Sequence, residues 1–504
     1  MYFIVILATT VLSFITFTYL LFKNSYRTWE KLKVPYVTPK FPFGNFNLPT
    51  KSQHFGIQCH QLYEKLKGKD QYAGIYLFKQ PNLLALHPDF VKLILVDDFN
   101  TFNERGLNVD LKHDPITENI YFLSGSEWRN MKQKLLNGFT SNRMRTIFKT
   151  LSEVGEKFEE YLITSDLQGN ECNIKDIMTG YTADVLSSCL FGTDGDSIGN
   201  TNSEFCIASR KLLMNSSKYH NAIKFWAIMF PETAKKLGYC IFDKQSTKFF
   251  EQMLHKTIGF RKENNLHRND ILQTMIELMD HNDEYGLAIT FDEVIANIII
   301  FFYTSYESCT ITMSYVLYQL AQNRGIQTQL RWEIEQILNQ FEGKLNYDSL
   351  GRMQLLERVI LESLRMHPPI PIIQRIAKER YQLPNGSKIP RGTHVLISVL
   401  GIHYDSELYP NPNKFDPDRF IPEIVAKRHP YSYLPFGEGP RICIGQRLAM
   451  LIIKIGLVSI LRKYSFDIGD KTQIPLKIDT TSMTLLEPEN GIWLKLNADT
   501  KLRN

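Results

Sequence analysis

The sequence predicts a mainly α-helical protein with a small β-rich region, an α+β fold in which one large domain follows an N-terminal membrane anchor. Three observations predict this fold. Residues 1–22 carry no charge, helical periodicity dominates from about residue 87 onward, and short strand patterns flank the helical part on both sides. The composition, 43% hydrophobic and 22% charged, is that of an ordinary globular protein.

The first segment, MYFIVILATTVLSFITFTYLLF, is about as long as a helix must be to cross a bilayer. Four basic residues follow it between positions 23 and 33, so the positive-inside rule places the rest of the chain in the cytosol. A cleaved signal peptide is the alternative, but the apolar run is long, no charged region precedes it, and no small-residue cleavage site ends it. We expect a signal-anchor helix at 1–22 that contacts membrane lipid, a basic and proline-rich linker at 23–50, and one folded domain at 51–504.

Within that domain, AGIYLF (73–78) and NLLALH (82–87) have the pattern of short strands. The segments DFVKLILVDDF and FKTLSEVGEKFEEYLI have helical periodicity. Near the C-terminus, Asn490-Gly491 predicts a hairpin turn. No internal repeat is present, so the domain is expected to combine segments that are distant in the chain.

Charge and cysteine content exclude several classes of protein. The net charge of +5 is mild for 504 residues, which argues against a nucleic-acid binder. The seven cysteines are scattered and form no CxxC pair, which argues against a disulfide framework, a zinc site and a covalently attached c-type haem. Such cysteine usage fits a reducing compartment.

The most informative stretch is PFGEGPRICIG, residues 435–445. A single cysteine is usually a small buried hydrophobe. Here three glycines permit unusual backbone conformations and close approach to a ligand, and two prolines stiffen the loop. An apolar helix is expected directly afterwards, so Cys443 is expected at a helix N-terminus, where the positive end of the dipole favours a thiolate. This environment indicates a metal ligand.

The loop resembles the haem-binding loop of the cytochrome P-450 superfamily, the haem-thiolate monooxygenases. The family pattern Phe-x-x-Gly-x-Arg-x-Cys-x-Gly is matched by Phe436, Gly439, Arg441, Cys443 and Gly445. The resemblance implies the P-450 fold and a haem b cofactor, iron protoporphyrin IX, with Cys443 as its axial thiolate. It places Phe436 near the sulfur and pairs Arg441 with a haem propionate. A thiolate suits oxygen activation because it pushes electron density toward the iron.

A second motif lies in LERVILESLRMHPPIPIIQR, residues 356–375. Glu362 and Arg365 are three apart and share a helical face with apolar neighbours, so a buried pair that needs further partners is expected instead of an exposed one. By resemblance, they form a structural ion network with Arg419 of FDPDRF, and Arg375 contacts a propionate. A third motif, GSEWRNMKQKLL, resembles the family's Trp-Arg-x-x-Arg helix, with Trp128 retained and Lys132 in place of the last arginine.

One segment departs from the family pattern. The oxygen-activating helix should lie between residues 291 and 322, and where the family usually has Ala/Gly-Gly-x-x-Thr this chain has Thr304, Ser305, Tyr306, Glu307 and Ser308. By resemblance, Ser308 and Thr304 supply hydroxyls for proton delivery, and Glu307 feeds protons from solvent. The alternative is that these hydroxyls only bond back to preceding carbonyls of the helix.

The leading hypothesis is a membrane-bound monooxygenase that inserts one atom of O2 into a lipophilic small molecule, a xenobiotic or an endogenous compound. It would resemble the microsomal insect enzymes of the detoxifying kind and lie in the endoplasmic reticulum membrane with its catalytic domain on the cytosolic side. The resemblance implies electrons from NADPH-cytochrome P-450 reductase, with cytochrome b5 as a further candidate donor.

Three alternatives stay open. They are a reductase-independent haem-thiolate isomerase or dehydratase, a non-catalytic haem-binding ligand sensor, and a helical scaffold without haem. Substrate contacts are expected, by resemblance, from residues 106–122, 205–225, 370–374, Tyr303, Thr304 and the region of Met483, and these include Tyr121, Phe122, Ile370, Ile372 and Ile373.

Overall fold

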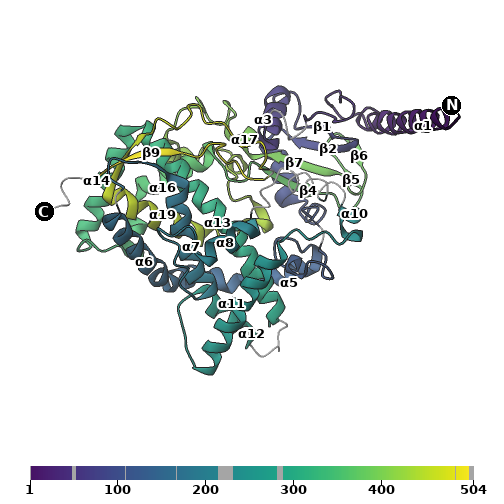
Figure 1. The fold of residues 1–504 in the computed structure, drawn as a ribbon. Helices are drawn as coiled ribbons and strands as arrows, with labels where there is room; N and C mark the ends of the chain where they lie inside the picture. The colour runs from purple at the N-terminus through teal and green to yellow at the C-terminus, as the bar shows by residue number, and fades with distance from the viewer. Residues whose placement is uncertain are drawn as a thin grey trace.

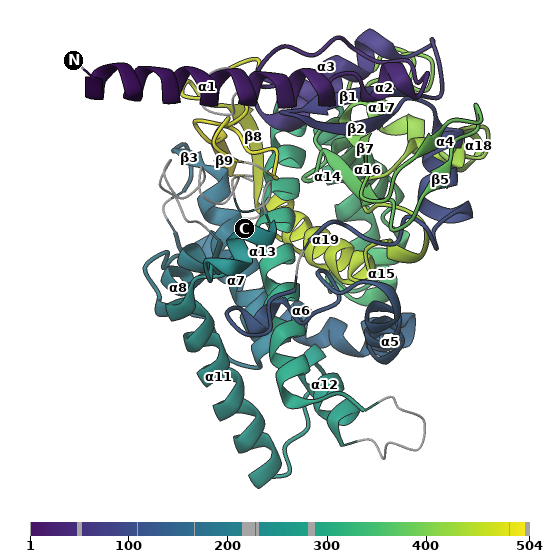
Figure 2. The same ribbon diagram turned by 90° about the vertical axis from the view of Figure 1, so that its right-hand side faces the viewer.

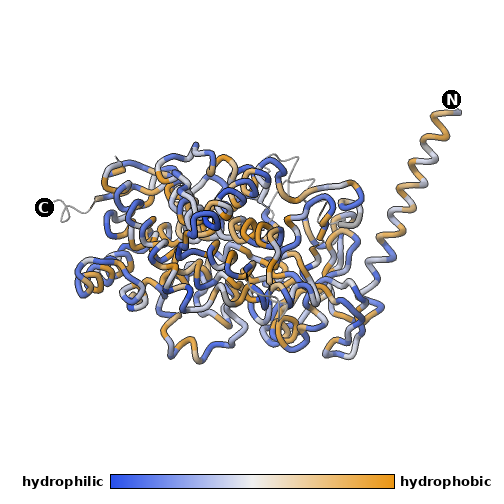
Figure 3. Tube along the Cα trace, turned by 90° about the horizontal axis from the view of Figure 1, so that it is seen from below, coloured by the Kyte–Doolittle hydropathy of each residue, from blue (hydrophilic) through white to orange (hydrophobic). Residues whose placement is uncertain are grey.

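The computed structural model describes residues 2–47, 53–107, 109–165, 167–213, 227, 231–280, 288–482 and 484–498. The apolar N-terminal segment forms one helix, α1 (Tyr2–Ser25), which projects from the body of the protein (Figures 1 and 3). Its hydrophobic side chains are exposed along its length. One other described helix, α13 (Phe291–Gln322), is long and apolar enough to cross a membrane, but most of it is buried inside the protein.

Part of the segment expected as a linker, residues 23–50, contacts the folded domain. A short helix, α2 (Thr28–Lys31), carries Trp29, which is completely buried and donates its indole N–H to the carbonyl of Ile75 at 3.1 Å. A Cβ atom on Gly74 would lie 2.5 Å from the Trp29 ring, so only glycine fits there. The chain after the anchor is therefore fixed to the first strand by side-chain packing.

That strand belongs to a four-stranded sheet in the order β1-β2-β7-β4. Its members are β1 (Tyr72–Leu77), β2 (Gln80–Ala85), β7 (His394–Ser398) and β4 (Ile372–Ile376). The β1–β2 and β4–β7 pairs are antiparallel, whereas β2 and β7 are parallel. Both early strands expected from the sequence are confirmed, and α3 (Phe55–Leu66) packs near this sheet (Figure 1).

The rest of the chain is mostly helical and surrounds α13, which begins with a capping box formed by Thr290 and Glu293. Figure 2 shows α13 and α19 in the middle of the body. The helices are α4 (Pro88–Lys92), α5 (Gly125–Leu136), α6 (Ser141–Thr164), α7 (Ile174–Leu186), α8 (Glu204–Leu213), α10 (Pro231–Lys236), α11 (Lys244–Glu263), α12 (Ile271–Met279), α14 (Arg324–Gln340), α15 (Tyr347–Arg352), α16 (Gln354–Met366), α17 (Val399–His403), α18 (Pro422–Val425) and α19 (Gln446–Lys463). A large apolar core joins α6, α7, α13, α16 and α19. The mainly helical prediction is confirmed.

Small strands complete the fold. The sheet β3-β9-β8 contains β3 (Glu171–Asn173), β9 (Trp493–Ala498) and β8 (Tyr464–Ile468), and β5 (Tyr381–Gln382) pairs with β6 (Lys388–Ile389). Gly491 adopts a left-handed conformation with φ +70°, as a turn requires. However, β9 pairs with β8 and β3, so the prediction of a simple hairpin across Asn490-Gly491 is wrong.

Candidate active site

The cysteine loop is a tight connection that ends where α19 begins. Gly439 has φ +75°, and a Cβ atom there would lie 2.2 Å from the carbonyl oxygen of Leu95, so this position requires glycine. The backbone N–H of Cys443 donates to the carbonyl of Phe436 at 2.9 Å, which closes the loop on itself. Gly445, with φ −87°, is the N-cap of α19 and has a backbone conformation that other residues also adopt.

The thiol of Cys443 opens into a cavity of about 890 Å³. Burial raises the pKa of this thiol, and the Gly445 backbone and Arg105 offset the rise only in part. Coordination to a metal ion deprotonates a thiol outright, so the ligand role does not depend on a low intrinsic pKa.

Arg441, in the cysteine loop, and Arg375, on β4, reach the same cavity from two different elements. Arg441 is 4% exposed, and one of its Nη atoms donates to the carbonyl of Leu123 at 2.6 Å. Arg375, on β4, is 3% exposed, and within the described residues its side chain donates to the carbonyl of Gln374 alone, at 2.8 Å. Three of their remaining N–H positions, Nε and Nη1 of Arg441 and Nε of Arg375, find no partner in the described part of the chain.

Within the described residues, no carboxylate forms an ion pair with these arginines, and the charge of Glu104 offsets that of Arg441 only in part. Burial, with Arg105 and Arg375 nearby, lowers the pKa of Arg441 to about 8. Burial and Arg105 likewise lower the pKa of Arg375 to about 9. Buried cations with unfilled hydrogen-bonding positions are costly unless an anion joins them. Two carboxylates placed between these arginines would supply the missing charge, so the residues fit a planar cofactor that carries two propionates.

The helix α5 adds the expected tryptophan and lysine. The guanidinium of Arg441 lies 4.4 Å from the centre of the Trp128 ring, and the ammonium of Lys132 lies 5.4 Å from it. Lys132 also donates to the carbonyl of Pro440, in the middle of the cysteine loop. All three side chains line the cavity, as does Phe436.

A residue that the sequence analysis did not single out joins this group. Arg105 lines the cavity, donates to the carbonyl of Tyr121 at 2.9 Å and lies 4.3 Å from the centre of the Tyr121 ring. The segment around it, FNTFNERG (99–106), does not by itself indicate which way the Arg105 side chain points.

The hydroxyl-bearing segment of α13 faces the cavity. Thr304, Ser305 and Ser308 all line it. Thr304 donates to the carbonyl of Ile300 at 2.8 Å, and Ser308 donates to the carbonyl of Thr304 at 2.7 Å. Both hydroxyls thus bond to preceding carbonyls of the helix, which was the alternative to a role in proton delivery. Proton transfer by Ser308 therefore requires its hydroxyl to rotate.

Glu307 does not line this cavity. Its carboxylate lies 3.1 Å from the ammonium of Lys175, whose side chain also lies 2.9 Å from Glu487. Successive residues of a helix are turned by about 100°, so a residue next to Ser308 points to a different side. The structure therefore brings Thr304 and Ser308 together and turns Glu307 away from them.

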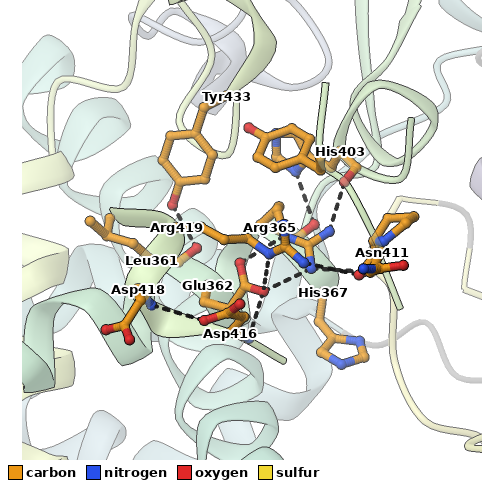
Figure 4. A network of polar contacts seen from close by, with 12 residues as sticks. Leu361, Glu362, Arg365, His367, His403, Asn411, Asp416, Asp418, Arg419 and Tyr433 are labelled. Atoms are coloured by element: carbon orange, nitrogen blue, oxygen red, sulfur yellow. Dashed lines mark hydrogen bonds and ion pairs between the residues drawn. The ribbon is translucent and has the colours of Figure 1, made fainter. Parts of the chain in front are cut away.

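The expected ion network is present in the core (Figure 4). Glu362 and Arg365 are both fully buried and joined by two hydrogen bonds of 2.7 and 2.9 Å. Arg419 lies 3.3 Å from Glu362, and Arg365 also donates to the carbonyls of His403 and Pro412, each at 2.8 Å. The imidazole of His403 in turn bonds the Arg365 carbonyl. The pair thus has the further partners that burial demands.

The substrate segments expected from the sequence line the cavity in part. Tyr121, Ile370, Ile372 and Ile373 do so. Phe122 packs instead in the core, 6.0 Å from the ring of Phe242. Met483 and residues 214–225 lie outside the described residues. In the expected region of Met483, Thr480, Ser482 and Thr484 line the cavity and add hydroxyl groups to its wall.

A helical domain that directs Cys443, together with arginines that form no ion pair within the described residues, into one large cavity is the architecture of a haem-thiolate protein. A family model described as Cytochrome P-450 matches residues 35–495. The chain is 36% identical to probable cytochrome P-450 6a13 of Drosophila melanogaster, over 94% of both chains. It is 33% identical to cytochrome P-450 6A1 of Musca domestica, also over 94% of both chains. The chain therefore belongs to the cytochrome P-450 family and is a haem-thiolate monooxygenase with the family's haem cofactor.

Proposed function

We propose that this chain oxidises lipophilic small molecules at a haem held by Cys443, in a cavity beside a membrane anchor. One observation carries the proposal. The unpartnered N–H positions of Arg375 and Arg441 open into the same cavity as the Cys443 thiol. A ligand that satisfies both features must present a metal to the sulfur and anionic groups to the arginines, which is what iron protoporphyrin IX offers.

The residues divide the work of holding this group. Cys443 ligates the iron, and Phe436 shields the sulfur from one side. Arg441, Arg375, Lys132 and Arg105 pair with the propionates, and Trp128 supports two of these cations through its ring. When bound, the haem supplies the redox chemistry by which one atom of O2 enters the substrate and the other leaves as water.

The hydroxyls of Ser308 and Thr304 hold protons at the cavity wall. Ser308 is anchored by its bond to the Thr304 carbonyl, and a rotation would free it to donate into the cavity. Glu307, one residue before it, connects this part of α13 to an ion cluster on the far side of the helix. We assign Ser308 and Thr304 to proton delivery and Glu307 to proton supply.

The substrate lies against a mostly apolar wall. Ile370, Ile372 and Ile373 approach from one side of the cavity and Ile300 and Phe301 from another. Burial of apolar surface contributes roughly 25 cal/mol per Å² to binding, so this lining selects lipophilic molecules. The polar contacts available, from Thr480 and Thr484, orient such a molecule and add little to affinity.

The anchor sets where the reaction takes place. Residues 1–22 would lie in the endoplasmic reticulum membrane as a single-pass helix, with 23–50 leading to a cytosolic catalytic domain at 51–504. Electrons would come from NADPH-cytochrome P-450 reductase in the same membrane, and cytochrome b5 is a second candidate donor. The short path from α1 to the domain, with Trp29 buried, supports a domain held close to the bilayer.

The test is reconstitution of the full-length protein with the reductase in liposomes and a panel of lipophilic substrates. The proposal predicts oxygenated product that requires both NADPH and O2. Product formed from hydroperoxides without NADPH would instead indicate an isomerase or dehydratase. Ligand binding without any product would indicate a sensor.

A further inference from the structure

The ion cluster behind α13 joins three segments that are distant in the chain. Lys175 lies in the first turn of α7, Glu307 in the middle of α13, and Glu487 in the antiparallel segment 477–489. The exposed fractions of the three side chains are 22%, 9% and 17%. One ammonium group thus serves two carboxylates in a poorly solvated place.

The position of Lys175 is unfavourable without those carboxylates. A cation in the first turn of a helix faces the positive end of the helix dipole. Burial also works against its charge, yet Glu307 and Glu487 more than compensate, and they raise the pKa of Lys175. The lysine is therefore held at this site by the two glutamates and not by its own helix.

Glu487 connects the cluster to the substrate cavity. Segment 477–489 folds back on itself, with the N–H of Asp479 donating to the carbonyl of Glu487 and that of Glu489 donating to Lys477, both at 2.8 Å. Its tip carries Thr480, Ser482 and Thr484, which line the cavity. The carbonyl of Leu486 accepts the Tyr315 hydroxyl of α13 at 3.1 Å, so the segment already rests on α13 near this lysine.

Glu307, the residue to which we assign proton supply, belongs to the same ion cluster. Burial raises the pKa of Glu307, Lys175 lowers it, and Glu487 raises it again. Tyr306 on α13 faces Cys206 and Arg210 of α8, and Tyr315 faces Glu487. Burial raises the pKa of both phenols, so neither loses its proton near neutrality.

We propose that Lys175 is a positioning residue, which holds Glu307 and the cavity-lining segment 477–489 in one ion bridge and so couples the supply of protons to the seating of the substrate. This inference rests on the proposed function, because it assumes that Glu307 supplies protons to Ser308. It differs from that function in naming a residue that touches neither substrate nor haem.

Substitutions of Lys175 and of Glu487 should shift the pKa of Glu307 in opposite directions. Lys175→Met removes the cation, so the pKa of Glu307 should rise. Glu487→Gln removes the competing carboxylate, so the pKa of Glu307 should fall. If Lys175 only filled space in the core, the two substitutions would not shift the pKa of Glu307 in opposite directions. Lys175→Arg keeps the charge and should restore behaviour close to that of the wild type.

The direct readout is an infrared pH titration of the ferric haem protein at rest. The carboxyl C=O band of Glu307 is identified as the band missing in Glu307→Gln, and its titration is then followed in the other variants. We expect its midpoint at higher pH in Lys175→Met, at lower pH in Glu487→Gln and near the wild-type value in Lys175→Arg. The control is Lys157→Met, which removes an exposed lysine paired with Asp194 at 3.0 Å and should change nothing.

Turnover supplies the second readout. Product formed per NADPH should fall severalfold in Lys175→Met, and the spectral Kd for substrate should rise in both Lys175→Met and Glu487→Gln as the segment loses its tie. A titration midpoint that stays in place in Glu487→Gln, or moves the same way as in Lys175→Met, overturns the proposal. If Lys175→Met fails to take up haem, the direction in which the titration midpoint of Glu307 moves in Glu487→Gln is sufficient to test the proposal. Because the titration needs no turnover, a wild-type protein without NADPH-dependent product would count against the proposed function and not against this bridge.

Discussion

The imidazole of His403 accepts the backbone N–H of Leu434 at 2.8 Å. On its other side the same ring donates to the carbonyl of Arg365 at 3.0 Å. Leu434 directly precedes the cysteine loop, and Arg365 belongs to the buried ion network. One fully buried side chain therefore transmits the position of the Glu362–Arg365 pair to the segment that holds Cys443.

This arrangement makes stability depend on pH. Burial lowers the pKa of His403 and His367 to about 3 and those of His54 and His394 to about 4, from an ordinary value of 6.5. These rings stay neutral in the folded protein but bind protons in the unfolded chain below pH 6.5. The unfolded state then holds more protons, so stability is lost as pH falls from 6.5 toward 4.

The measurement is the free energy of unfolding by urea at a series of pH values in that window. Each of these histidines should contribute up to about 1.4 kcal/mol per pH unit. His394→Gln should reduce the slope, because it removes one of the four groups. A free energy that does not change between neutrality and about pH 5 would contradict this account.

The two left-handed glycines of the cysteine loop should differ in their tolerance of alanine. Gly439→Ala would place a Cβ atom 2.2 Å from the Leu95 carbonyl, whereas Gly437, with φ +73°, has no atom within 4 Å of that position. Gly437→Ala should therefore cost only the backbone strain, about 1–2 kcal/mol, and still bind haem. Gly439→Ala should lose haem. Equal haem content in the two purified variants would show that the close approach to Leu95 has no consequence.

Removing one cation of the basic cluster should weaken haem retention. Arg441→Leu deletes a charge-assisted contact worth about 1.5–3 kcal/mol, so haem should transfer to an acceptor globin roughly ten to a hundred times faster. Arg145→Leu, which breaks an exposed pair with Asp348 at 2.9 Å, is the matched control and should not change the rate. The same transfer rate in both variants would remove Arg441 from the cofactor site.

The two serines of α13 that line the cavity, Ser305 and Ser308, should change the coupling of NADPH use to product in opposite directions when they are substituted. Ser308→Ala removes the hydroxyl assigned to proton delivery, so product per NADPH should fall severalfold and hydrogen peroxide should rise. Ser305→Gly gives the cavity wall more room, and coupling should improve. The measurement is NADPH consumption, product and peroxide in parallel. If Ser308→Ala leaves both NADPH use and product unchanged, its hydroxyl does not deliver protons.

Local sequence patterns predicted the features that local chemistry determines. The glycine- and proline-rich loop around Cys443, the pairing of Glu362 with Arg365 and the apolar first helix all depend on neighbours within a few residues. The direction of Glu307 was also within reach, because an adjacent helical position points about 100° away from Ser308.

Contacts between distant segments could not be read in this way. Lys175 meets Glu307 and Glu487 across 132 and 312 residues only because α7, α13 and segment 477–489 converge in the fold. Arg105 and His403 carry no pattern of their own that separates them from ordinary loop and helix residues. The raised pKa of the Cys443 thiol likewise follows from burial, which a single sequence does not reveal.

The central claim is that the sulfur of Cys443 ligates the haem iron. Its most direct test is the carbon monoxide difference spectrum of the reduced full-length protein, compared with that of Cys443→Ala. The account predicts a strongly red-shifted Soret band in the wild type and its complete loss in the variant. A red-shifted band that survives in Cys443→Ala, or a wild-type protein that incorporates no porphyrin, would contradict it.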